Sequence, residues 1–236
     1  HFISDEKLQE ILAYLNPLYG GVEGHTPAYI HALINVLYIN GASRFIDGSQ
    51  QLADALKCVI NAHGGDVIPN CEVTRIEVTD KKVNFVETSK GEKFIGDWYI
   101  SSIHPIEMIK MVPQGTFLKG FITRLNEIPN SYSAFSLFID LKPHTLPYID
   151  HTCYYMEDFG AMWTQDKFDG KNWPQGFMYM TPPDSNQGEF ATRLLVHCIM
   201  SYEQVKKWEN TTVGHRGKSY NEWKADCVNK ILDKLG

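Results

Sequence analysis

The sequence predicts an α+β fold with two lobes, and three observations support this prediction. The chain has 236 residues, more than a usual single domain. Apolar residues recur at helical spacing in three segments before residue 66, and the segments that follow alternate between apolar and polar residues as strands do. Aromatic-rich β segments after residue 130 indicate a second lobe built on a sheet.

Composition and charge favour a globular protein without a nucleic-acid partner. Hydrophobic residues make up 43% of the chain and charged residues 21%. The net charge is −6, and no block of Lys and Arg is present. No apolar run reaches the ~18 residues of a membrane-spanning helix, and no charged-then-apolar leader is seen. We therefore expect a cytoplasmic protein.

The cysteine and histidine residues predict neither disulfides nor a metal site. Five cysteines lie far apart in the sequence and form no C-x-x-C pair, which is typical of reduced, buried thiols. The nearest cluster of metal-ligand types consists of His144, His151 and Cys153, but no second Cys/His pair completes a tetrahedral set. We expect no bound metal.

Three helices are expected in the first 65 residues. The first carries Leu8, Ile11, Leu12 and Leu15 after Ser4 as its N-cap. A second helix over 28–40 is apolar almost all round, so it is either buried in protein or faces an apolar ligand or a lipid surface. A third helix begins after 47–49 and ends at Gly64–Gly65, with its apolar face inward.

Strands and further helices are expected in the rest of the chain. In the first lobe the strands are 66–69, 72–78, 83–87 and 94–101, followed by a short helix at 105–112. In the second lobe they are 117–125, 132–141, 152–156, 177–181 and 192–200, and helices at 202–210 and 219–235 end the chain.

No motif in the chain specifies a reaction by itself. The nucleophile elbow G-x-S-x-G, the zinc motif H-E-x-x-H and the dinucleotide-binding motif G-x-G-x-x-G do not occur. The residues alone lead to a two-lobed protein with an unusually aromatic, apolar interior, and they identify no catalytic residue.

The order of four segments resembles the middle of one flavoenzyme family. These segments are Arg44–Leu56, His63–Val67, Cys71–Ile76 and Trp98–Pro105. The family is the phytoene desaturase, carotenoid isomerase and retinol saturase group of FAD-dependent oxidoreductases, within the amine-oxidase-like flavoprotein superfamily. The chain departs from the family pattern at Asp47, which replaces the first residue of a Gly-Gly pair.

The resemblance implies a domain organisation and a set of cofactor contacts. Residues 1–43 would be a helical lid of the substrate domain, 44–112 a returning segment of the FAD-binding domain, and 113–236 a substrate-binding domain with a mixed or antiparallel sheet and covering helices. Val73 would lie beside the FAD adenine, and Ser101, Ser102 and Ile103 would pass the flavin. The alternatives are a core strand residue for Val73 and a strand-to-helix cap for the two serines.

The resemblance also implies a function. The chain would be part of a desaturase, saturase or isomerase that acts on a carotenoid- or retinoid-like apolar polyene. The longer protein would bind FAD, and NAD(P) is a possible electron partner. The fragment alone would be inactive. Peripheral membrane contact is a further option. The helix Tyr29–Ile39 and seven aromatic residues would line the apolar channel: Phe135, Phe138, Tyr154, Tyr155, Trp163, Phe177 and Tyr179.

Two other functions remain open from the sequence. One is a non-catalytic module that binds an apolar ligand or lipid. The other is an amine-oxidase-like flavoenzyme with a different, polar or charged substrate, although the near absence of charge in 28–40 argues against it.

Overall fold

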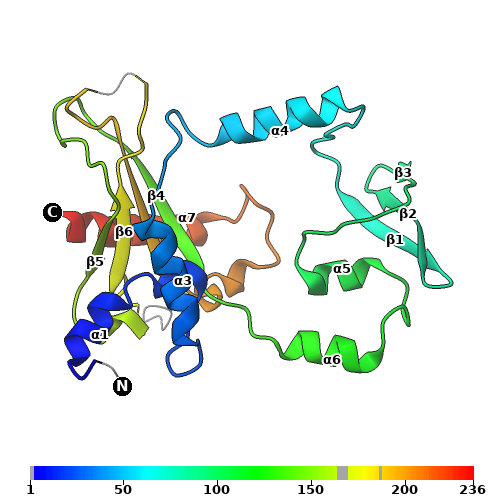
Figure 1. The fold of residues 1–236 in the computed structure, drawn as a ribbon, viewed down its shortest axis with the longest axis horizontal. Coiled ribbons are helices and arrows are strands. Elements are labelled where there is room, and N and C mark those ends of the chain that lie inside the picture. Colours follow the sequence, from blue (N-terminus) through cyan, green and yellow to red (C-terminus); the bar gives the residue numbers. More distant parts are fainter. Residues whose placement is uncertain (1–2, 164–169, 186–187) are drawn as a thin grey trace. The chain divides into compact units, whose positions relative to one another are not determined.

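The computed structural model describes residues 3–163, 170–185 and 188–236. It divides the chain into two compact units, which we call the sheet unit (His1–Gln51 and Ser131–Gly236) and the hairpin unit (Leu52–Asn130). The sheet unit contains a four-stranded sheet, and the hairpin unit a three-stranded one (Figure 1). Helices and sheets follow one another along the chain, which confirms the predicted α+β fold class.

The sheet of the sheet unit is antiparallel throughout. Its strands are β4 (Ser133–Asp140), β7 (Arg193–Met200), β6 (Gly176–Met180) and β5 (Cys153–Met156), in that spatial order. Each neighbouring pair is antiparallel, so the described strands form the antiparallel rather than the mixed alternative. All four were predicted from their aromatic and β-branched residues, which favour a pleated surface.

One face of this sheet packs against the C-terminal helix α7 (Lys218–Leu235). Along β7, the alternate residues Val196 and Cys198 are fully buried, and they share a core with Cys227 and Ile231 of α7. The ring nitrogen of Trp173 donates to the Ile199 carbonyl at 2.8 Å. In Figure 1, α7 lies behind the strands. Because side chains alternate between the two faces of a strand, this packing fixes which residues are left on the opposite face.

Short helices begin the sheet unit: α1 (Glu6–Leu12), α2 (Asn16–Tyr19) and α3 (Ala28–Ile39). Asp5, not the predicted Ser4, caps α1, because its carboxylate accepts from the Leu8 amide. His31 of α3 joins the three helices. Its Nε2 donates to the Leu12 carbonyl at 2.7 Å, and its Nδ1 lies 2.8 Å from the Tyr19 hydroxyl.

Of the two alternatives for the apolar helix α3, burial in protein is wrong for the described residues. Leu33, Leu37 and Ile39 are exposed, Ile39 to 80%. The apolar face of α4 (Gln50–Ala62) was expected to point inward, but Leu56 and Val59 on it are exposed as well. An apolar helix face becomes buried only where a second layer covers it, and periodicity alone does not show whether that layer is present.

The turn before α4 keeps the backbone that a glycine pair would give. Asp47 has a φ of 63° and Gly48 a φ of 94°, so both are in the left-handed region. Asp is one of the few residues other than glycine that visit this region routinely. The Asp47 amide donates to the Pro183 carbonyl at 3.0 Å, and its carboxylate accepts from the Ser185 amide at 2.8 Å.

The hairpin unit is built on β1 (Val73–Thr79), β2 (Lys82–Thr88) and β3 (Lys93–Phe94), all antiparallel. The β1–β2 loop consists of Asp80 and Lys81, both with positive φ, as two-residue hairpin loops require. The helices α5 (Pro105–Met111) and α6 (Lys119–Glu127) follow. Among the described helices, none is long and apolar enough to cross a membrane.

Four predicted segments differ from the structure. Residues 117–125 were predicted as a strand, but Leu118, Phe121, Ile122 and Leu125 have helical spacing and the segment forms α6. Residues 66–69 are irregular, and the strand expected at 94–101 shrinks to β3 before Gly96. The helix expected at 202–210 is two 3-10 turns, η2 (Tyr202–Gln204) and η3 (Lys206–Trp208).

The cysteines are all free, but they differ in exposure. Cys198 and Cys227 are buried as predicted, whereas Cys58 is exposed, against the prediction. Burial raises the pKa of the Cys198 thiol to about 12 and that of Cys227 to about 11. Since the thiolate is the reactive form, these two thiols are doubly protected, by burial and by protonation.

We predict that Ile231→Ala lowers the free energy of unfolding of the sheet unit by about 2–5 kcal/mol, because it leaves a cavity in the core between α7 and the sheet. The neighbouring Leu232, 43% exposed, provides the control: Leu232→Ala is expected to cost under about 1 kcal/mol. Urea unfolding followed by tryptophan fluorescence measures both. Equal losses in the two variants would show that α7 is not docked as described.

We predict that Cys58 reacts fastest with a disulfide reagent such as dithionitrobenzoate in the native protein, and that Cys198 and Cys227 react only after unfolding. Cys58→Ser should remove one equivalent from the fast phase. Peptide mapping of the labelled protein identifies the thiols. Labelling of Cys198 or Cys227 at the rate of Cys58 under native conditions contradicts the prediction.

Candidate functional site

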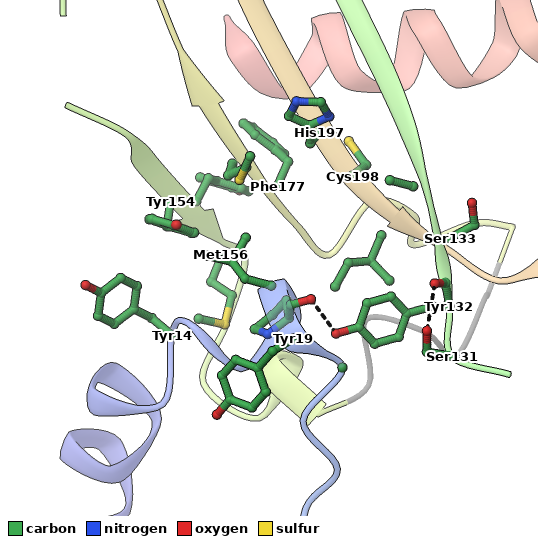
Figure 2. A pocket seen from close by; sticks show the side chains of 17 residues that line it. Tyr14, Tyr19, Ser131, Tyr132, Ser133, Tyr154, Met156, Phe177, His197 and Cys198 are labelled. Carbon is green, nitrogen blue, oxygen red and sulfur yellow. Dashed lines mark hydrogen bonds between the residues drawn. The ribbon is translucent and has the colours of Figure 1, made fainter. Parts of the chain in front are cut away.

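A cavity of about 590 Å³ lies in the sheet unit, between the N-terminal helices and the four-stranded sheet (Figure 2). The chain around α2 supplies one wall with Tyr14, Pro17, Leu18 and Tyr19. Residues of all four strands supply the opposite wall. The volume is within the range of about 300–1,000 Å³ that is usual for small-molecule sites.

The strand register explains which side chains form the sheet wall. Ser136 of β4 pairs with His197 of β7, His197 with Met178 of β6, and Met178 with Tyr154 of β5. These four residues form one row across the sheet, on the face away from α7. The next row on the same face contains Ala134, Ile199 and Met156, which also line the cavity.

Tyrosines hold one side of the cavity. Tyr14 meets Tyr154 edge to face, with ring centroids 5.1 Å apart. Burial and the neighbouring Tyr38 and Tyr14 raise the pKa of Tyr154 to about 12, so its hydroxyl stays protonated at neutral pH. Opposite them in Figure 2, the Tyr132 hydroxyl donates to the Pro17 carbonyl at 2.6 Å and ties the start of β4 to α2.

The described residues that line the cavity carry no formal charge. None of the seventeen residues that line it is Asp, Glu, Lys or Arg. Its polar groups are hydroxyls, backbone groups and the ring of His197. A charged ligand group enclosed here would lose its hydration without finding an opposite charge, which is strongly unfavourable. The arrangement therefore suits a neutral ligand that is largely apolar.

His197 is the one ionisable imidazole among the lining residues. Its Nδ1 lies 2.7 Å from the Ser136 hydroxyl oxygen. Burial lowers the pKa of the imidazole from its ordinary value, so the neutral ring prevails at pH 7. A neutral imidazole offers one donor and one acceptor nitrogen.

Three of the aromatic residues expected to line a channel do line this cavity: Tyr154, Tyr155 and Phe177. The other four do not. Phe135 and Tyr179 lie on the α7 side of the sheet and pack against the core, and Phe138 is 77% exposed. Trp163 of η1 and the helix Tyr29–Ile39 contribute no lining residue. The register places Tyr155 and Phe177 in one row with Phe135, on the α7 side, so these two border the cavity although their row belongs to the core side of the sheet. Composition could not reveal this.

Sequence reasoning missed His197, Tyr14, Tyr19 and Tyr132. For His197 a signal was present: it is the one polar side chain in the apolar run Leu194–Met200. A polar residue inside a buried strand needs a partner, which makes it informative. The tyrosines give no such signal, because they belong to loops and short helices whose packing is not periodic.

The residues expected to contact FAD all lie in the hairpin unit. Val73 begins β1, an edge strand, so the outer side of its backbone is not used by the sheet. Ser101, Ser102 and Ile103 form an exposed irregular segment, and His104, not a serine, caps α5. Among the described residues, no hydrogen bond joins Val73 to this segment. A free strand edge and small exposed serines fit close approach by a cofactor.

No metal centre is visible in the part of the chain that the structure describes, since it holds no group of three His, Cys, Asp or Glu residues placed to share an ion. His151 instead pairs with Asp150, with 2.8 Å between Nδ1 and a carboxylate oxygen.

Comparison with known proteins gives one distant match. No family model and no solved structure matches the sequence. A zebrafish (Danio rerio) protein named all-trans-retinol 13,14-reductase is 22% identical over 253 aligned positions, which cover 98% of this chain and 41% of that protein. The chain thus spans about two-fifths of the relative's length. The printed name of this relative concerns retinol and says nothing specific of phytoene desaturases or carotenoid isomerases. Along nearly its whole length, the chain is distantly similar to a retinol reductase.

Proposed function

We propose that this chain is part of an FAD-dependent oxidoreductase that acts on a retinoid- or carotenoid-like polyene, and that it comprises the substrate-binding domain and a returning segment of the FAD-binding domain. The observation that carries the proposal is the cavity of about 590 Å³, whose walls hold aromatic and methionine side chains and, among the described residues, no charged one. The distant likeness to a retinol reductase supports the same conclusion.

The cavity favours a polyene over an amine. A polyene gains about 25 cal/mol for each Å² of apolar surface that leaves water, and it demands no charged partner. An ammonium group enclosed here would need a carboxylate as its partner, and none of the described lining residues is acidic. The amine-oxidase-like alternative is therefore disfavoured.

The proposed chemistry is the addition or removal of two hydrogens across a carbon–carbon double bond. Saturation adds one hydride and one proton to the double bond, and NAD(P)H or another reductant supplies the electrons. Desaturation removes the same hydride and proton. Isomerisation leaves the number of hydrogens unchanged. FAD, when bound, supplies the hydride chemistry. Val73, Ser101, Ser102 and Ile103 are proposed to contact it. The pyrophosphate would need residues beyond this chain, which contains no G-x-G-x-x-G.

The non-catalytic alternative, a module that binds an apolar ligand or lipid, uses the same cavity. The enzyme would bind flavin, whereas the non-catalytic module would not. The cofactor is therefore the discriminating measurement, and substrate turnover is the next.

We predict that the full-length protein carrying this chain is yellow when purified, releases FAD identified by mass, and converts all-trans-retinol under reducing, anaerobic conditions to a product two hydrogens heavier. Met178→Asp, which places a charge in the cavity wall, should lower this conversion at least tenfold and leave the flavin spectrum unchanged. Phe138→Asp, on the same sheet face but outside the lining, is the matched control.

The outcomes separate the two functions. A colourless protein that takes up no added FAD would overturn the enzyme and leave the binding module. A flavoprotein whose conversion of retinol is unaffected by Met178→Asp would place the substrate elsewhere than in this cavity.

We also propose that the protein is cytoplasmic and touches membranes peripherally through α3, whose Leu33, Leu37 and Ile39 are exposed. The full-length protein should then co-sediment with phosphatidylcholine vesicles, and Leu37→Glu should reduce the bound fraction several-fold. If the wild-type protein and Leu37→Glu bind the vesicles equally well, α3 is not the membrane contact.

A further inference from the structure

The pair Ser136–His197 is a polar pair on an otherwise apolar part of the sheet face. On the same face, the row on one side of it consists of Phe138, Leu195 and Met180. The row on the other side holds Ala134, Ile199 and Met156. Ser136 is exposed and His197 is half-buried, so the imidazole ring remains accessible to a ligand in the cavity. The hydrogen bond between the two side chains fixes how the ring is presented there.

The hydrogen bond to Ser136 occupies only one nitrogen of the His197 ring. Nδ1 lies 2.7 Å from the serine hydroxyl, and Nε2 has no hydrogen-bond partner among the described residues. His197 lines the cavity and is half-buried, so Nε2 exchanges hydrogen bonds with solvent when the cavity is empty. A purely hydrocarbon ligand that covers the ring would remove this water and leave a polar atom unpaired, which costs affinity.

We propose that His197, oriented by Ser136, is the hydrogen-bond anchor for the hydroxyl group of an apolar alcohol bound in the cavity. This inference rests on the proposed function and narrows its substrate class from polyenes in general to polyene alcohols. His197 acts here as a specificity-determining residue; the chemical step does not depend on it.

A hydroxyl group suits this site better than other polar groups. If Ser136 donates to Nδ1, then Nε2 carries the proton and donates to the ligand oxygen; in the other tautomer Nε2 accepts. A hydroxyl can both donate and accept, so it pairs with either tautomer, whereas an aldehyde pairs with only one. A carboxylate would need a positive charge, and no lining residue provides one.

Two of the tyrosine hydroxyls in the lining are already engaged in hydrogen bonds within the protein. The Tyr132 hydroxyl already donates to the Pro17 carbonyl, and the Tyr19 hydroxyl is engaged with Asn16 and His31. Tyr154 stands in the same row as His197 but two strands away, beyond Met178. A rod-shaped ligand that ends at His197 would therefore pass over Met178 toward the tyrosine side.

The test compares two retinoids that differ in the hydroxyl group. All-trans-retinol and the hydrocarbon anhydroretinol are titrated separately into the full-length protein, with quenching of tryptophan fluorescence as the readout. His197→Phe keeps a planar ring and removes the hydrogen bond. We expect it to raise the dissociation constant of retinol about tenfold and to leave that of anhydroretinol unchanged within about twofold.

Two further variants test the role of Ser136 and control for the loss of a histidine. Ser136→Ala leaves His197 in place but frees its ring, and it should weaken retinol binding selectively by a smaller factor. His215→Phe makes the same side-chain change at an exposed histidine outside the lining and should affect neither retinoid. Circular dichroism confirms that each variant is folded.

The outcomes distinguish this inference from the proposed function. Equal losses for both retinoids in His197→Phe, or no loss for either, overturn the anchor even if the protein is an active flavoenzyme. Selective loss of retinol binding supports the anchor even if the protein proves colourless and inactive. Failure of the wild-type protein to bind either retinoid overturns both the anchor and the proposed substrate class.

Discussion

The packing of α7 against one face of the four-stranded sheet is the constraint on which the sheet unit depends. Cys227 and Ile231 of the helix, with Val196 and Cys198 of β7, form a fully buried layer. Because a strand must divide its side chains between two faces, commitment of one set to the helix assigns the other set to the cavity. The site is thus a consequence of the core, and a change in strand register would destroy both.

The lining of the cavity favours apolar, uncharged ligands. Its aromatic and thioether side chains offer apolar contact in many directions, and methionine adapts to irregular shapes. The absence of charge in its lining removes a means of discriminating between ligands by electrostatics. Selection among apolar ligands then depends on length, shape and the few hydrogen-bonding groups, of which the imidazole of His197 is the most distinctive.

Sequence patterns predicted the elements whose periodicity reflects their burial. The four strands of the sheet unit and the helix α7 were all foreseen from alternation or helical spacing. Residues 117–125 were misjudged, because aromatic and β-branched content was weighed above the helical spacing of Leu118, Phe121 and Leu125. The exposure of α3 could not be foreseen, since an apolar helix does not specify its neighbour. The cavity depends on the meeting of α2 with a sheet over 100 residues later, which no local pattern encodes.

The turn at Asp47 has a left-handed backbone at two consecutive residues, and only the second of them is a glycine. A left-handed backbone is what the Gly-Gly pair provides, and Asp47 adopts it while adding a carboxylate that holds the Ser185 amide. Replacement of Asp47 by glycine would keep the left-handed backbone and the amide bond to the Pro183 carbonyl, but it would lose the carboxylate that accepts from the Ser185 amide. A single residue thus sets the conformation of the turn and also links it to a segment 138 residues later in the chain, which a glycine at this position could not do through a side chain.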